Sequence, residues 1–154
     1  MKLRTIVVGA AMCLFSLTLC FADNAMMGTW KLNEAKSKIP VGAAKSVTVT
    51  YAAAGDSVKC TIDGVDGKGS PTHTEWTGKF DGKDYPVTGD PNQTTRSVKP
   101  ITDHKFAVDI KKDGKVTMSG HIEIAADGKS RTVALTGTDA SGKKVTSKAV
   151  YDKQ

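Results

Sequence analysis

The chain has 154 residues, of which 39% are hydrophobic and 6% aromatic, so it is long enough for one globular domain and too apolar to be disordered throughout. Its formal net charge is +6, but no basic run is longer than a pair such as Lys111–Lys112, which argues against nucleic-acid binding. Outside residues 1–22 there are only two leucines against twelve valines and sixteen threonines, a composition that favours strands and excludes an all-helical bundle.

Residues 1–22 have the pattern of a secretory signal peptide. Lys2 and Arg4 come first, and an apolar stretch, residues 6–19, follows before Asp23. That stretch is shorter than the roughly 20 residues that a membrane-spanning helix needs. We expect cleavage before Asp23 and a soluble product in the periplasm or the extracellular medium, with no membrane insertion.

The three cysteines bear on export and stability. Cys20 offers a second interpretation, because lipoproteins are cleaved directly before a cysteine that then carries lipid. Leu19 stands where lipoprotein signals usually have a small residue, so we favour cleavage before Asp23. Loss of Cys13 and Cys20 leaves Cys60 alone, which excludes an internal disulfide. Cys60 alternates with apolar neighbours and is expected to be a small buried core residue.

Residues 23–154 alternate apolar and polar side chains with a period of two, which is typical of half-buried strands. Asp-Gly pairs separate many of these segments and accept the positive φ angles of a type I′ hairpin turn. Consecutive hairpins predict one all-β domain, an antiparallel up-and-down meander that closes into a barrel of about eight to ten strands. The outward positions are polar, which excludes an outer-membrane barrel. The alternating segments are 47–51, 58–62, 74–80, 106–110, 116–124, 133–137 and 145–151, and the Asp-Gly pairs begin at 66, 81, 113 and 127.

Two segments interrupt the alternation. Residues 33–45 contain Pro40 and Gly42 and leave room for a turn or two of helix at most. Residues 85–92 contain two prolines and predict a loop or an irregular edge strand.

A Gly-x-Trp motif, Gly28-Thr29-Trp30, opens the first strand of this meander, and Val150-Tyr151-Asp152-Lys153 ends the last one. In these features the chain resembles the calycin superfamily, the lipocalins and fatty-acid-binding proteins, and in particular short exported bacterial proteins described as lipocalin-like. The resemblance implies that Trp30 packs at a closed barrel end under a basic residue, beside Gly28. It also implies an interior that binds a small apolar molecule.

The chain departs from those families at three points. Only thirteen residues separate Leu32 from Ser46, so the helical lid of fatty-acid-binding proteins is missing. Ala149 stands where their carboxylate clamp has an arginine. Lys144 or Lys148 would have to replace the arginine that lipocalins place over the tryptophan.

Five candidate ligand-binding residues lie on the predicted inward face. Four are aromatic and could either pack as ordinary core or line a cavity, because small barrels use the same positions for both. The fifth, Arg96, shares the face of Val98 by the period of two. It either reaches bulk solvent from a frayed strand or meets the acidic head group of a ligand. The five candidates are Tyr51, Trp76, Arg96, Phe106 and Tyr151.

The sequence offers little for catalysis or metal binding. A Gly-x-Ser-x-Gly elbow is missing, and thirteen of the sixteen acidic residues are aspartates, mostly in turns. His73-x-Glu75 and His121-x-Glu123 each place two possible metal ligands on one strand face, but that face is expected to point to solvent. His104 is expected in a turn. We therefore predict a non-enzymatic protein without metal or cofactor.

Two functions remain open from the sequence. The first is an exported barrel that binds a small apolar or amphipathic ligand. The alternative is a filled barrel that acts as an envelope or extracellular interaction or structural module. Cavity volume discriminates the two, because an interior packed at about 0.75 density with no void of a few hundred Å³ would exclude the first.

Overall fold

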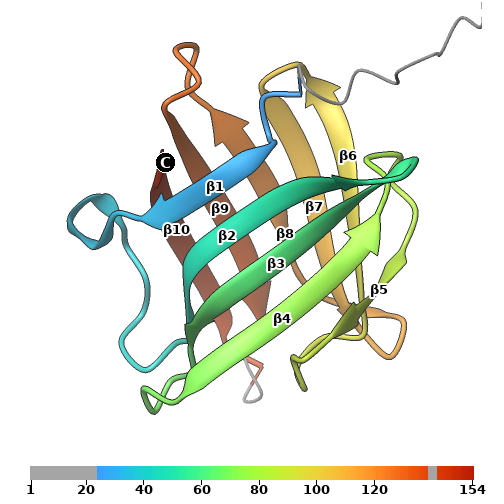
Figure 1. Cartoon of the computed structure of the whole chain (residues 1–154). Coiled ribbons are helices and arrows are strands. Elements are labelled where there is room, and N and C mark those ends of the chain that lie inside the picture. Colours follow the sequence, from blue (N-terminus) through green and yellow to red (C-terminus); the bar gives the residue numbers. More distant parts are fainter. Residues whose placement is uncertain (1–23, 139–141) are drawn as a thin grey trace, which may run out of the picture.

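The computed structural model describes residues 24–138 and 142–154; the predicted signal peptide, with Cys13 and Cys20, lies outside them. Each strand pairs antiparallel with the next in sequence, and β1 pairs with β10, which closes the barrel (Figure 1). The predicted up-and-down barrel is confirmed, with ten strands. They are β1 (Gly28–Leu32), β2 (Lys45–Ala54), β3 (Ser57–Val65), β4 (Pro71–Gly78), β5 (Tyr85–Thr88), β6 (Thr95–Thr102), β7 (Lys105–Lys112), β8 (Lys115–Ile124), β9 (Ser130–Thr138) and β10 (Lys144–Lys153).

The two irregular segments are now defined. A single 3₁₀ turn, η1 (Glu34–Lys36), follows β1, as the prediction of at most a turn or two of helix allows. The segment with two prolines contains β5, which pairs with both β4 and β6. It is therefore not an edge strand, because closure gives every strand two neighbours. Among the described residues, no helix is both long and apolar enough to cross a membrane.

The Asp-Gly-Lys sequences form turns in two different ways. Asp113 and Gly114 both have positive φ, 49° and 80°, as a type I′ turn requires. The other three aspartates do not, so the type I′ prediction is wrong for them. Their carboxylates instead accept the N–H of the lysine two residues on, which closes an Asx turn. These hydrogen bonds join Asp66 to Lys68, Asp81 to Lys83 and Asp127 to Lys129, at 2.8, 3.0 and 2.9 Å.

One end of the barrel, which we call the Trp30 end, is closed by Trp30 and by Met26, which precedes β1. Trp30 is fully buried, pairs with Lys153 of β10, and donates a hydrogen bond from Nε1 to the carbonyl oxygen of Met26 at 2.9 Å. Met26 is itself fully buried. The prediction of a buried Trp30 beside the C-terminal strand is confirmed.

The basic residues over Trp30 are not the predicted ones. Lys144 and Lys148 are exposed on the outside of β10. Arg131 of β9 lies with Cζ 4.9 Å from the Trp30 ring centroid, and the Nζ atom of Lys153 lies at 5.1 Å. Arg131 shares the inward face of Val133 and Leu135, so the alternation of its own strand carries it into the core.

We predict that Trp30→Ala lowers the free energy of unfolding by about 3–5 kcal/mol, because it leaves a large cavity at the Trp30 end. Urea denaturation of the mature chain measures this. The control is Val41→Ala, since Val41 is fully exposed and should change stability little. Equal midpoints for the two variants would contradict the packing role of Trp30.

Candidate functional site

All five candidate residues lie inside the barrel and are buried. Trp76 stacks on Phe80 at a centroid distance of 6.2 Å, and Phe80 contacts Phe106 at 5.6 Å. Gly78 leaves room for the Trp76 ring, because a Cβ atom at position 78 would lie 2.7 Å from Cζ2 of Trp76. Trp76 and Phe106 are thus two members of a continuous aromatic core.

Arg96 projects into the interior from the start of β6. Its relative exposure is only 8%, so the interpretation in which it reaches bulk solvent is wrong. Trp76 fixes its backbone, because the indole Nε1 donates to the Arg96 carbonyl at 3.0 Å. The predicted inward face of this strand is confirmed.

The Arg96 guanidinium has one polar partner among the described residues. Nη2 donates to Oε1 of Gln93 at 2.9 Å, whereas Nε is buried without a hydrogen bond. None of the ion pairs of the described residues includes Arg96. A buried cation without an anion is costly, which marks this position as unusual.

Gln93 is a site residue that the sequence interpretation missed. Its side chain is buried at 7% exposure, in the loop between β5 and β6, and donates from Nε2 to Oδ2 of Asp90 at 2.5 Å. Asp90 also accepts the Asn92 N–H on Oδ1 at 2.8 Å. The chain Arg96–Gln93–Asp90 therefore links the interior cation to a carboxylate at the rim. Nothing in the local sequence distinguishes Gln93 from an ordinary polar loop residue.

Three buried polar side chains, those of Tyr51, Tyr151 and Cys60, lie close enough to Arg96 and Arg131 for the two positive charges to affect their pKa values. Burial raises the pKa of Tyr51 and of Tyr151, and the two guanidinium charges oppose that rise. Burial also raises the pKa of Cys60, which is fully buried as predicted. At neutral pH the phenols keep their protons, so they can donate hydrogen bonds but cannot neutralise Arg96 or Arg131.

Arg131 is buried in a different environment. Its Cζ atom lies 4.9, 5.3 and 4.9 Å from the ring centroids of Trp30, Tyr51 and Tyr151. Its Nη1 atom donates to the Sδ atom of Met26 at 3.4 Å, and Nε has no hydrogen bond. Three aromatic faces supply the negative potential that stabilises this cation. Arg131 is a structural part of the closed end.

The opposite end of the barrel, which we call the Arg96 end, has a wetter interior. Arg96 stands in a cross-strand row with Ile110, Met118 and Val145. These three apolar residues face inward but are only partly buried, whereas Val108 is buried. Solvent therefore reaches the inner wall of β7, β8 and β10 near this end.

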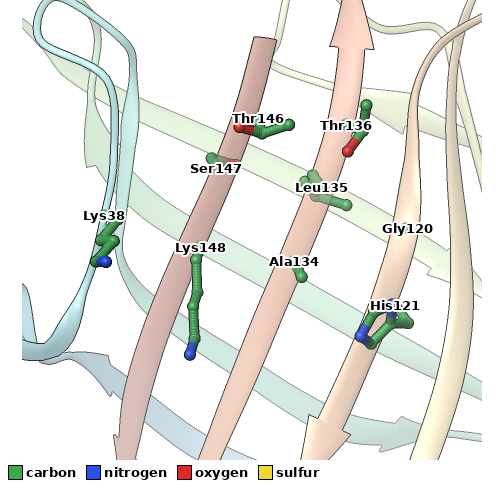
Figure 2. Close-up of a pocket in the computed structure, with 9 residues that line it drawn as sticks. All are labelled: Lys38, Gly120, His121, Ala134, Leu135, Thr136, Thr146, Ser147 and Lys148. Atoms are coloured by element: carbon green, nitrogen blue, oxygen red, sulfur yellow. The ribbon is translucent and has the colours of Figure 1, made fainter.

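A hollow of about 370 Å³ lies on the outside of β8, β9 and β10 (Figure 2). Ala134 forms part of its floor, and His121, Lys148 and Lys38 stand around it. Lys38 is held beside β10 by two backbone hydrogen bonds to Lys148, of 2.7 and 2.9 Å. This surface is basic and is separate from the barrel interior. A second outer hollow of about 430 Å³ is lined by His104, Glu123 and Thr132 among others.

The two His-x-Glu pairs lie on the outer surface, as expected. His73 contacts Asp63 through Nδ1 at 2.7 Å and Glu75 through Nε2 at 3.6 Å, and Lys59 pairs with Glu75 at 2.6 Å. Within residues 24–138 and 142–154, no three His, Cys, Asp or Glu side chains are arranged to hold a metal ion. His104 lies in the turn between β6 and β7, as predicted.

Comparison with known proteins adds no assignment. No protein-family model matches the chain, and no curated protein matches it.

We predict a raised pKa for His73, above the usual 6.5, because Asp63 and Glu75 favour the protonated ring. The contact stabilises the folded chain below pH 6.5, and this contribution disappears as the pH rises through the folded-state pKa. NMR titration of the His73 ring measures the value. Asp63→Asn should lower it, and a wild-type value at or below that of this variant would contradict the ion pair.

Proposed function

We propose that the protein is an exported, non-enzymatic barrel that binds a small amphipathic molecule through an anionic group placed at Arg96. The observation that carries the proposal is the buried Arg96 guanidinium, whose hydrogen-bond partner among the described residues is an uncharged amide. Export rests on the signal-like pattern of residues 1–22. The calycin resemblance of Gly28-x-Trp30 supports the same function.

Electrostatics favours an anion at this position. A buried cation without a counter-charge loses hydration that a single neutral hydrogen bond does not replace. An anionic oxygen would gain a charge-assisted hydrogen bond from the guanidinium, and a planar anionic group could accept two. The unpaired Nε–H of Arg96 supplies a second donor for it.

The inner wall beside Arg96 supports an apolar portion of the ligand. Ile110, Met118 and Val145 stand in the same cross-strand row and are partly exposed. An apolar chain lying on these residues would remove their surface from water, at about 25 cal/mol per Å². The ligand would then enter at the Arg96 end, because Trp30 and Met26 close the other end.

We predict that Arg96→Ala weakens binding of a dansyl-labelled undecanoic acid by at least about tenfold, the usual effect of losing a charge-assisted hydrogen bond. Fluorescence titration of the mature protein measures the dissociation constant, and thermal unfolding checks that the fold persists. Arg96→Met is the matched variant, because it retains most of the side-chain volume and removes the charge.

Lys83→Ala is the control, since it removes one positive charge from an exposed turn that lines neither the interior nor the outer hollow. Arg131→Ala does not serve as a control, because Arg131 lies in the closed end of the barrel. Equal affinity of the wild type and both Arg96 variants, or failure of all to bind, would end the proposal.

The basic outer hollow favours the alternative, an extracellular interaction module. The hollow is surrounded by Lys38, Lys148 and His121. None of these three side chains forms an ion pair with another described residue. A flexible polyanion could lie across this face without entering the barrel.

We predict for this alternative that dextran sulfate binds the wild type in dilute salt. Affinity should fall about severalfold when Lys38 and Lys148 are both changed to Ala, and it should decrease as salt screens the charges. The control is a double variant, Lys83→Ala with Lys99→Ala, which loses the same two positive charges. Both lysines are exposed and lie outside the hollow. Identical binding by the two double variants would exclude this surface.

A further inference from the structure

The Gln93 side chain occupies the place beside Arg96 that the ligand's anionic group would take. Its carboxamide oxygen accepts from Nη2 of Arg96 at 2.9 Å, and its carboxamide nitrogen donates to Asp90. Both side chains are buried, at 8% and 7% exposure. Gln93 therefore gives the interior cation an uncharged partner from the chain itself.

A carboxamide has the planar shape and nearly the size of a carboxylate. The space beside the guanidinium thus already accommodates a trigonal planar group with an oxygen directed at Arg96. A carboxylate offers two such oxygens and a full negative charge, whereas the Gln93 amide offers one oxygen and none. A tetrahedral phosphate is bulkier than the group that fills this space.

We propose that Gln93 is a displaceable occupant of a carboxylate site at Arg96. This inference rests on the proposed function and names its ligand class: a monocarboxylate whose head group replaces the Gln93 amide. The Gln93 side chain then turns out toward the rim, and Arg96 exchanges a neutral hydrogen bond for a salt bridge. Without ligand, the amide prevents Arg96 from being left unpaired, which would cost more than its neutral hydrogen bond provides.

The position of Gln93 permits this exchange. It lies in the short loop between β5 and β6, directly after Pro91 and Asn92, which are both exposed. The carboxylate of Asp90 holds both the Gln93 amide and the backbone N–H of Asn92. Displacement of Gln93 therefore breaks side-chain hydrogen bonds only, and leaves the strand pairing of β5 with β6 intact.

The test compares Gln93 variants that empty or permanently fill the site. Gln93→Ala removes the competitor and should tighten binding of dansyl-labelled undecanoic acid by about threefold, the range of one neutral hydrogen bond. Gln93→Glu combined with Asp90→Asn places a carboxylate on the chain itself and keeps a donor at position 90. This double variant should weaken binding by at least about tenfold, because the internal carboxylate occupies Arg96.

Asp90→Asn alone is the control, and thermal unfolding shows whether the fold persists. The double variant should melt no lower than this control, because it pairs a buried charge. The methyl ester of the same probe should bind the wild type more weakly than the acid, since it has no charge to offer Arg96.

The outcomes separate this inference from the proposed function. Binding that falls in Arg96→Met but is unchanged in both Gln93 variants overturns the displacement and leaves the proposed function in place. Equal affinity of the wild type for the acid and for its methyl ester would contradict the proposal that the ligand is a carboxylate. If neither the wild type nor Gln93→Ala binds the probe, both proposals fail.

Discussion

Closure of the barrel depends on a short seam between the first and last strands. Three residue pairs join β1 to β10, beginning with Trp30 and Lys153. The chain lengthens this seam beyond the strand, because the Asn33 N–H donates to the Val150 carbonyl at 2.8 Å and its side chain donates to Asp152 at 2.7 Å. Arg131 then contacts rings of β1, β2 and β10 from inside. The closed barrel that buries these two cations therefore depends on this seam.

The two interior arginines show that burial alone does not identify a binding residue. Arg131 is surrounded by three aromatic faces, so its charge is stabilised by groups that cannot leave without opening the closed end. Arg96 has a single amide from a surface loop, which can leave by rotation of its own side chain. The difference lies in how readily the partner is exchanged, and it assigns one arginine to the fold and the other to the candidate site.

Period-two alternation was sufficient to predict the barrel, the burial of Cys60 and the inward face that Arg96 shares with Val98, but it left open whether Arg96 reaches bulk solvent. The same rule places Arg131, which stands two residues before Val133, on the inward face, but Arg131 was not among the residues singled out from the sequence. Alternation fails where β2 has a bulge between Ser46 and Thr48, because one extra residue exchanges the two faces. The burial of Gln93 could not be predicted from the sequence, since it depends on the conformation of a loop and on a contact with Arg96 rather than on a periodic pattern.

The distribution of large side chains constrains how a ligand could lie. Trp76 of β4 and Phe106 of β7 are buried in the interior, and both rings contact Phe80. A head group at Arg96 therefore cannot direct an apolar chain toward the Trp30 end without displacing that aromatic core, which would cost several kcal/mol. The remaining direction follows β7 to β10, where Met118 and Val145 are partly exposed. The geometry thus favours a ligand that enters head first and leaves its apolar end near the rim.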